Sequence, residues 1–133
     1  MAAWTTNQIP DLSSKTVVIT GANSGLGFES AKAMANQGAK VILACRSTER
    51  GENAKQEILA EVPDAKLHAM TLNLQDLSSI ESFATEFTNN FDRLDVLLNN
   101  AGIMNTPYGL TNDGFETQMG TNHLGHFALT GQL

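Results

Sequence analysis

The residues near the start of the chain best suited to binding chemistry are three glycines in the stretch TGANSGLG, Thr20 to Gly27. They follow a short apolar run and precede an alanine-rich helical pattern. The first turn of a helix has unpaired N–H groups and the positive end of the helix dipole, and a pyrophosphate binds there when no Cβ blocks its approach. The spacing predicts that Gly21 permits a sharp turn, Gly25 lets phosphates approach and Gly27 permits close helix packing.

The glycine-rich turn has two other possible interpretations. The first is a strand-to-helix connection that needs glycine only for a positive φ. The second is the loop of phosphoryl-transfer ATPases, which requires G-x-x-x-x-G-K-[ST]. No lysine follows these glycines, so the sequence disfavours an ATPase.

The residue that selects between dinucleotides is expected at the adenosine ribose, about 20 residues after the glycines. An acidic side chain there selects NAD, and an arginine favours the 2′-phosphate of NADP. The stretch VILACRSTER has no acidic residue before Glu49, and Arg46 follows the expected second strand. Arg46 therefore indicates NADP(H) rather than NAD(H), and the alternative is a solvated surface arginine. We expect Cys45 to pack as a small apolar residue.

The elements that must position these residues alternate along the chain. Apolar, β-branched runs predict four strands, and patterns of helical spacing separate them. The expected strands are 15–20, 40–44, 66–72 and a fourth in DVLLNNAG that is entirely apolar at 96–98. The expected helices are 25–37, 48–61, one containing Ile80, Phe83, Ala84, Phe87 and Phe91 with Ser78 or Asp76 as its cap, and one from Gly114 or Phe115 onward.

Near-continuous apolar strands separated by helices are typical of a parallel sheet with both faces covered. The fold class is therefore α/β, a doubly wound, Rossmann-like sheet with the expected strand order 3-2-1-4. In the first helix, helical spacing places Leu26, Ser30, Ala33 and Met34 on one face, which we expect to be the packed face.

Composition limits the class of protein. The chain has 133 residues, 41% hydrophobic and 17% charged, which fits one ordinary globular domain. Eight basic and fourteen acidic residues give a net charge of −6, which disfavours nucleic-acid binding. No apolar run approaches the roughly 20 residues of a membrane span. We expect a cytoplasmic location, with the single cysteine unable to form an internal disulfide.

Four motifs together resemble the short-chain dehydrogenase/reductase family, from about Leu12 to the last residue. They are T-G-x-x-x-G-x-G, ACR after the second strand, NNAG at residues 99–102 and TNHLGHFALT at residues 121–130. ACR and NHLGHF resemble the retinol-dehydrogenase-like subset. The resemblance implies an oxidoreductase that transfers hydride between NADP(H) and carbonyl or alcohol substrates, small molecules of lipophilic character. The cofactor-binding residues it implies are Gly21, Asn23, Ser24, Gly25, Leu26, Gly27, Arg46, Asn73, Leu74, Asn100, Ala101 and Gly102.

Two of these segments, Asn73 with Leu74 and the NNAG motif, carry specific expectations. The family usually has an aspartate followed by an apolar residue after the third strand, contacting adenine, and Asn73 with Leu74 stands there. The Asn73 oxygen can still accept from the adenine amino group, or it can instead make an Asx-type turn. In NNAG, the resemblance implies that Asn100, Ala101 and Gly102 line the cofactor while Asn99 helps to pin the sheet.

The resemblance also implies a catalytic set: a Tyr-x-x-x-Lys pair, a serine, and an asparagine that links the lysine to a water relay. Asn122 stands at the position of the asparagine, and the other three have no counterpart. Tyr108 precedes Asn122 and residue 112 is asparagine, so we expect Tyr108 to be a loop aromatic. His123 and His126 have no evident third ligand for a metal, and we expect them to be packing or surface residues.

These observations lead us to expect that residues 1–133 form the N-terminal dinucleotide-binding part of a single Rossmann-like domain without its C-terminal catalytic half. The isolated chain is then expected to be inactive. Its fourth strand would be an unpaired apolar edge, which favours association with a second copy or with a complementing C-terminal half. The alternative from another class is a non-catalytic nucleotide-binding or partner-complemented fragment.

Overall fold

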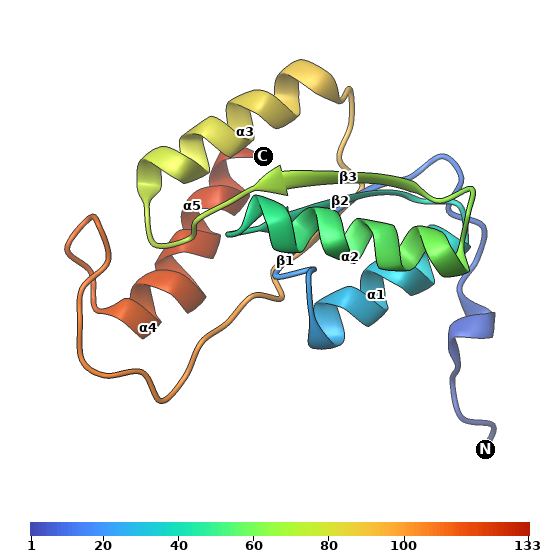
Figure 1. Cartoon of the computed structure of the whole chain (residues 1–133), viewed down its shortest axis with the longest axis horizontal. Coiled ribbons are helices and arrows are strands. Elements are labelled where there is room, and N and C mark those ends of the chain that lie inside the picture. The colour runs from blue at the N-terminus through green and yellow to red at the C-terminus, as the bar shows by residue number, and fades with distance from the viewer.

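Four short strands form one parallel sheet at the centre of the molecule (Figure 1). The structure, a computed structural model, describes residues 1–133. The strands are β1 (Thr16–Thr20), β2 (Lys40–Cys45), β3 (Lys66–Thr71) and β4 (Val96–Leu98). Their order is β3-β2-β1-β4, with Thr16 opposite Lys40 and Lys40 opposite Lys66. The predicted fold class and strand order are confirmed, and β4 lies at an edge.

The helices cover both faces of this sheet (Figure 1). They are α1 (Gly25–Asn36), α2 (Thr48–Glu61), α3 (Leu77–Asn90), α4 (Thr117–Met119) and α5 (Gly125–Gln132). A short 3₁₀ turn, η1 (Thr6–Gln8), lies near the N-terminus, and a π-helical turn, η2 (Gly120–Leu124), joins α4 to α5. None of the helices is long and apolar enough to cross a bilayer.

Alternation along the strands separates the core into two layers. Val17 and Ile19 of β1 pack with α1 and α2, whereas Val18 packs with α3 and α5. The first layer includes Ala31, Ala35, Ala54 and Ile58, and the second includes Ile80, Phe83, Phe87 and Leu129. Both faces of the sheet are thus buried, as the continuous apolar runs of the strands predicted.

The packed face of α1 differs from the predicted one. Gly27, Ala31 and Ala35 face the sheet, while Leu26 is 81% exposed. The buried positions are four residues apart and carry little or no side chain, so the helix backbone approaches the strands closely. Of the predicted face, Met34 packs partly against the core, and the prediction was wrong for Leu26.

The last helical segment begins later than predicted, at Thr117. The Glu116 carboxylate accepts hydrogen bonds from the N–H groups of Gln118 at 3.0 Å and Met119 at 2.8 Å. Phe115 instead donates its N–H to Thr111 Oγ1, and Gly114 has a φ of 87°. The residues before Glu116 are therefore held in a turn. In α3, Asp76 rather than Ser78 is the N-cap.

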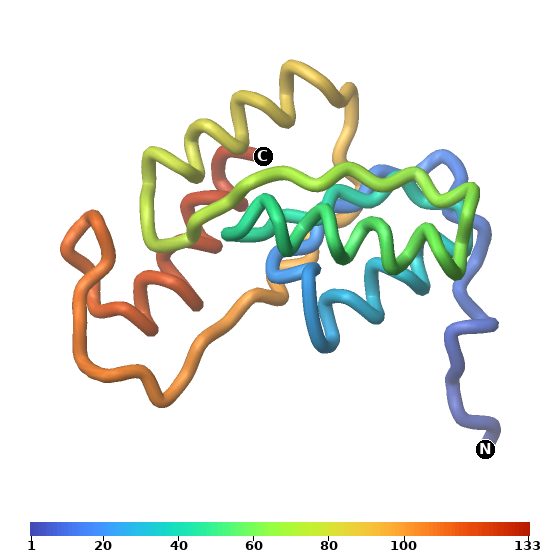
Figure 2. The backbone as a smooth tube through the Cα atoms, in the orientation of Figure 1, coloured from blue at the N-terminus to red at the C-terminus, as the bar shows by residue number.

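The segment between β4 and α4 is the longest connection in the chain (Figure 2). It leaves the end of β4 and leads to the layer that contains α3, where α5 packs. It carries the NNAG motif at its start and Tyr108 at an exposed position. This path brings residues 100–103 beside the residues that follow β1.

Candidate functional site

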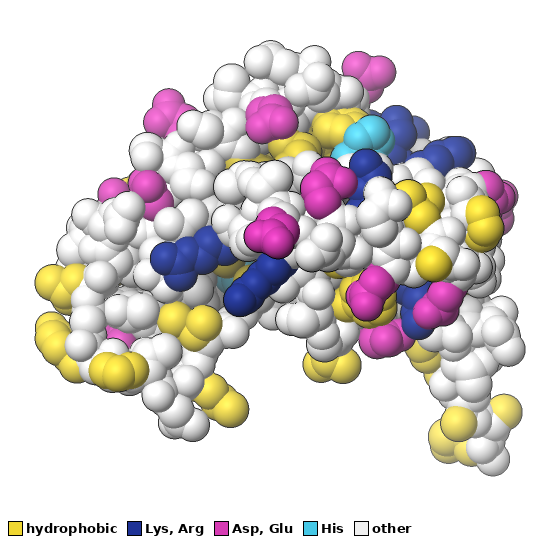
Figure 3. All heavy atoms as spheres, viewed as in Figure 1, with side chains coloured by type: hydrophobic (Ala, Val, Ile, Leu, Met, Phe, Trp, Pro, Cys, Tyr) yellow, Lys and Arg dark blue, Asp and Glu magenta, His cyan; other side chains and the backbone are white.

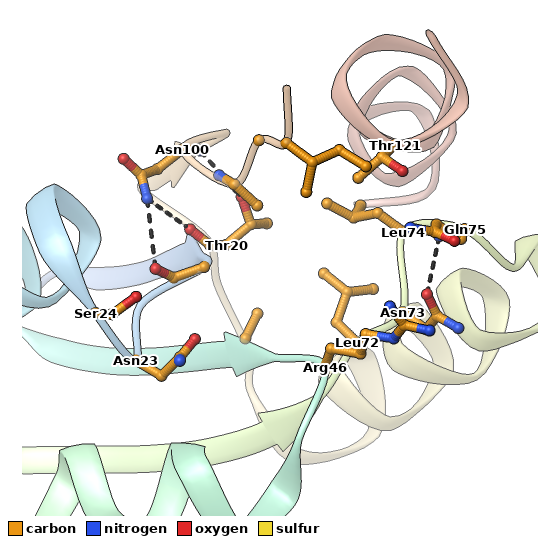
Figure 4. A pocket seen from close by; sticks show the side chains of 15 residues that line it. Thr20, Asn23, Ser24, Arg46, Leu72, Asn73, Leu74, Gln75, Asn100 and Thr121 are labelled. Carbon is orange, nitrogen blue, oxygen red and sulfur yellow. Dashed lines mark hydrogen bonds between the residues drawn. The ribbon is translucent and has the colours of Figure 1, made fainter. Parts of the chain in front are cut away.

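A cavity of about 340 Å³ lies beyond the carboxyl ends of β1, β2 and β3, beside the start of the segment after β4 (Figure 4). Ligands of open α/β sheets bind at this edge, and the volume lies within the range of small-molecule sites. Of the predicted cofactor-binding residues, all line the cavity except Gly25, Leu26 and Gly27. The lining residues are Thr20, Gly21, Asn23, Ser24, Ala44, Arg46, Leu72, Asn73, Leu74, Gln75, Asn100, Ala101, Gly102, Ile103 and Thr121.

The glycines of the turn have distinct reasons to be glycine. Gly21 has a φ of 64°, and a Cβ on it would lie 3.0 Å from Cα of Ala101. A Cβ on Gly27 would lie 2.5 Å from Nδ2 of Asn100 and closer still to the Gly21 carbonyl oxygen. Gly25 has a φ of 58° and open space around the place of its missing Cβ. The turn and the close packing predicted for Gly21 and Gly27 agree with this geometry.

The first turn of α1 has no side-chain cap. Its N-cap residue, Ser24, is exposed, and the Ser24 hydroxyl makes no capping hydrogen bond. The first N–H groups of a helix have no hydrogen-bond partner within the helix and depend on a capping side chain or a ligand. In α1 the Ser24 side chain does not provide such a partner. With the helix dipole, these N–H groups favour a negatively charged ligand at this end of α1.

Thr20 fixes the segment after β4 to the end of β1. Its hydroxyl oxygen accepts from the N–H groups of Asn100 at 3.0 Å and Ala101 at 2.9 Å. In return, Asn100 Nδ2 donates to the Thr20 carbonyl at 3.1 Å (Figure 4). Thr20 is completely buried. This arrangement holds one wall of the cavity to the glycine-rich turn.

Of the two NNAG asparagines, Asn100 lines the cavity as the resemblance implies, whereas the contact of Asn99 differs from the expected one. Asn99 was expected to pin the sheet, but its side chain is exposed and donates to Thr130 Oγ1 of α5 at 3.2 Å. Asn100 joins the ends of β1 and β4. Successive residues after a strand point to opposite sides, which explains why one asparagine faces α5 and the other the turn.

Arg46 and Asn73 lie on the side of the cavity formed by the ends of β2 and β3 (Figure 4). Arg46 is exposed and takes part in none of the ion pairs of the structure. Asn73 Oδ1 accepts from the Gln75 N–H at 3.0 Å, which is the Asx turn given above as its alternative role. The Asn73 N–H in turn donates to Ser79 Oγ at 2.9 Å.

Cys45 lies in the core beneath the turn, as expected of a packing residue. Burial raises the pKa of its thiol to about 11, although N–H groups of Ala22 and Asn23 favour the thiolate. A thiol with so high a pKa is a weak nucleophile at neutral pH. Cys45 therefore packs in the core beside Ala22 and Asn23, and its burial disfavours the reactive thiolate form.

Asn122, the predicted catalytic residue, lies in η2 outside the cavity lining. Its Oδ1 accepts from the Ile103 N–H at 2.9 Å, and its Nδ2 donates to the Ile103 carbonyl at 2.7 Å. Of the two neighbouring histidines, His123 is exposed and His126 is buried. The Nε2 of His126 lies 2.8 Å from Thr20 Oγ1, so α5 contacts the glycine-rich turn.

Several lining residues were not predicted. Thr20 precedes the glycines directly, and its position before a glycine-rich turn was a usable signal. Ala44 and Leu72 were the last residues of the second and third expected strands and were assigned no role in a site. Gln75, Ile103 and Thr121 reach the cavity because separate loops and η2 converge there, which no local pattern indicates.

Comparisons with known proteins agree with this geometry. Residues 15–133 match the family described as short chain dehydrogenase. Retinol dehydrogenase 12 of Mus musculus is 50% identical over 127 residues, which cover 95% of this chain and 39% of that protein. The chain thus spans about two fifths of the length of this curated relative.

Solved structures share the fold. An uncharacterised protein of Mycobacterium paratuberculosis is 50% identical with a TM-score of 0.88, over 99% of this chain and 46% of that one. A metagenomic short-chain oxidoreductase in complex with NADP is 27% identical with a TM-score of 0.79, over 92% and 56% of the two chains. The chain belongs to the short-chain dehydrogenase family, and over less than two fifths of their length it is similar to retinol dehydrogenases.

Proposed function

We propose that this chain binds NADP(H) in the cavity, with the diphosphate against the first turn of α1. The observation that carries the proposal is the uncapped start of α1. Ser24 makes no side-chain capping bond there, whereas Ser47, Asp76 and Glu116 cap α2, α3 and α4. Nothing lies within 4 Å of the place of a Cβ on Gly25, so the space beside these N–H groups is open. A bound diphosphate needs both features.

Arg46 supports NADP(H) over NAD(H). Arg46 lines the cavity and its guanidinium has no carboxylate partner, and a guanidinium pairs well with a phosphate. No acidic side chain lines the cavity to accept from a ribose 2′-OH. The NADP bound by the similar metagenomic oxidoreductase agrees with this choice.

The adenosine half of the cofactor would lie between Arg46 and the residues after β3. The Asx turn uses one lone pair of Asn73 Oδ1, which leaves the other and the amide N–H groups for the adenine edge. The apolar Leu74 lines the same wall. Asn100 and Ala101, which Thr20 holds, form the opposite wall together with Gly102, and the second ribose would lie there.

The reaction we propose is hydride transfer between NADP(H) and a lipophilic alcohol or aldehyde, because the chain is similar to retinol dehydrogenase 12. When bound, the nicotinamide ring supplies or accepts the hydride. Asn122 is the proposed link to a lysine and a water relay. Since its side chain already holds Ile103, only the second lone pair of Oδ1 and the second N–H of Nδ2 are free for that link.

The Tyr-x-x-x-Lys pair is not present in residues 1–133, so we propose that a complementing polypeptide segment supplies it. The edge strand β4 offers unpaired backbone groups to such a segment. Exposed apolar side chains also gather around the connection to α4, at the lower left of Figure 3. They include Met104, Tyr108, Leu110 and Met119. The alternative is a non-catalytic nucleotide-binding fragment, which these surfaces favour less because it needs no partner.

The test separates binding from turnover. Calorimetry of the purified chain with NADPH should show saturable binding at one site, weaker with NADH. Oxidation of NADPH in the presence of a panel of aldehydes should be undetectable for the chain alone and should appear when a Tyr-x-x-x-Lys segment is added in trans. Absence of NADPH binding would refute the proposed site, and turnover by the chain alone would refute the need for complementation.

A further inference from the structure

His126 is a buried polar residue that the proposed function does not use. It lies on α5, is 6% exposed, and contacts Thr20 at a separation of 106 residues. Its Nε2 is 2.8 Å from Thr20 Oγ1, and its Nδ1 is 3.0 Å from the Asn122 carbonyl oxygen. Both ring nitrogens therefore have partners, which ordinary packing of an aromatic ring does not require.

The partners decide where the imidazole proton lies. The carbonyl oxygen of Asn122 only accepts, so Nδ1 of His126 must carry the proton and donate it. In the neutral ring Nε2 is then an acceptor, and the Thr20 hydroxyl donates to it. The two lone pairs of Thr20 Oγ1 remain for the N–H groups of Asn100 and Ala101. Every donor and acceptor of the Thr20 hydroxyl is used once.

No other position of the imidazole proton satisfies the hydrogen bonds of both His126 and Thr20. With the proton on Nε2, two acceptors would face each other at Asn122, and Thr20 Oγ1 would have to accept three hydrogen bonds. The only other acceptor near the Thr20 hydroxyl is the Leu98 carbonyl, at the limiting distance of 3.5 Å. The orientation of the hydroxyl hydrogen therefore depends on His126.

The packing of α5 explains how His126 reaches the turn. A Cβ on Gly125 would lie 2.5 Å from the Leu74 carbonyl oxygen, so only glycine lets α5 approach the loop after β3 this closely. His126, the next residue, is then directed at the buried end of β1. Leu129, one turn later, is completely buried in the same layer.

We infer that His126 is a positioning residue for the nucleotide site. It orients the Thr20 hydroxyl so that its oxygen accepts from Asn100 and Ala101, and it thereby holds the wall of the cavity that these residues form. The inference rests on the proposed binding of NADP(H) for its effect on affinity. Its effect on the wall itself is independent of any ligand.

Three substitutions separate the two hydrogen bonds of the ring. His126→Gln places an amide oxygen near the position of Nε2 and can still accept from Thr20. His126→Asn can reach only the Asn122 carbonyl, and His126→Phe keeps a ring but neither bond. Thr20→Ser, which keeps the hydroxyl, and Thr20→Val, which removes it, form a matched pair at the other end.

The experiment combines NMR of the ligand-free chain with NADPH titration. We expect ¹⁵N shifts of a neutral His126 ring protonated at Nδ1, and a changed Nε2 shift in Thr20→Val but not in Thr20→Ser. Amide exchange at Asn100 and Ala101 should be about tenfold faster in His126→Phe and His126→Asn than in His126→Gln. The Kd for NADPH should likewise be higher in His126→Phe and His126→Asn than in His126→Gln.

The opposite tautomer, or equal exchange rates in the three variants, would overturn the positioning role. Faster exchange in His126→Phe with an unchanged Kd for NADPH would overturn its effect on binding. A wild-type chain that shows the expected tautomer and exchange but binds no NADPH would instead refute the proposed function while supporting the positioning of the wall.

Discussion

Asn122 and Ile103 are joined by two hydrogen bonds that pair a side-chain amide with both backbone groups of one residue. The Ile103 N–H donates to Asn122 Oδ1 at 2.9 Å, and Asn122 Nδ2 donates to the Ile103 carbonyl at 2.7 Å. The amide thus acts as a second strand would, and it holds the segment after β4 against η2. Ile103 lines the cavity, so this contact helps to define the site.

Loss of this contact should loosen the wall next to Ile103. We expect Asn122→Ala to lower the free energy of unfolding by about 1–2 kcal/mol, because two hydrogen bonds are lost. Asn99→Ala is the control, since it removes one exposed bond to Thr130 and should cost less. Urea unfolding measures both, and equal losses would contradict a special role for the Asn122 pair.

Gly25 can be tested against a second glycine of the same backbone type. Gly25 and Gly114 both have positive φ, 58° and 87°, and both have open space where a Cβ would be. Alanine at either position should therefore cost a similar amount of stability, about 1 kcal/mol. Only Gly25→Ala should weaken NADPH binding, by about tenfold or more, because only that methyl group meets the diphosphate.

The measurement for this pair is NADPH calorimetry together with urea unfolding. Equal affinities in Gly25→Ala and Gly114→Ala would mean that the first glycine serves only the backbone turn. That outcome would favour the plain strand-to-helix connection over a phosphate site.

Arg46 is tested by reversing its charge. Arg46→Asp should weaken NADPH binding by about tenfold to a hundredfold, the usual effect of losing a charge-assisted hydrogen bond. Binding of NADH should change much less. Lys66→Asp is the control, because Lys66 begins β3 at the opposite end of the strand and is exposed. Equal weakening of NADPH and NADH in Arg46→Asp would contradict a contact to the 2′-phosphate.

Asp95 should make part of the stability depend on pH. Hydrogen bonds from the Arg93 guanidinium and the Thr16 N–H hold its pKa below the ordinary value of 3.8. Because the pKa of Asp95 is lower in the folded than in the unfolded chain, its ionised form stabilises the fold when the pH is above the unfolded-state pKa. This contribution is lost as the pH falls through the folded-state pKa. Urea unfolding should therefore show Asp95→Asn less stable than wild type at about pH 7, with the difference shrinking below about pH 4.

Asp64→Asn provides the comparison for Asp95, because Asp64 is exposed and has no recorded hydrogen bond or ion pair. Its stability should follow the wild type at both pH values. A constant difference between wild type and Asp95→Asn over the whole pH range would show that the substitution acts through packing rather than through charge.

The strands and most helix limits could be predicted because local patterns determine them. β-branched runs define the strands, and the spacing of Ile80, Phe83 and Phe87 defines α3. Two features escaped. The first is the start of α4, where Glu116 is the N-cap, because a glutamate is not a residue that predicts an N-cap. The second is the packing of α1 through Gly27, Ala31 and Ala35. Hydrophobic patterns undervalue small residues whose role is to let backbones approach.

The residues of the candidate site, too, could be predicted only where a local sequence pattern identifies them. The glycine-rich turn, Arg46 and NNAG were recognisable because each lies at or near the carboxyl end of a predicted strand. The contacts of Asn99 with Thr130 and of Asn100 with Thr20 were not, because they depend on which side of the chain each amide faces. The contact of His126 with Thr20 joins residues 106 positions apart and requires the packing of α5 to be known.

The location of the bound diphosphate can be measured by an NADPH titration followed by ¹H–¹⁵N NMR. If the diphosphate lies against the start of α1, the largest shifts should occur at the amides of Asn23 to Gly27, with little change at Lys15, Lys40 and Lys66 at the other end of the sheet. Largest shifts at those lysines, with the amides at the start of α1 unmoved, would contradict it.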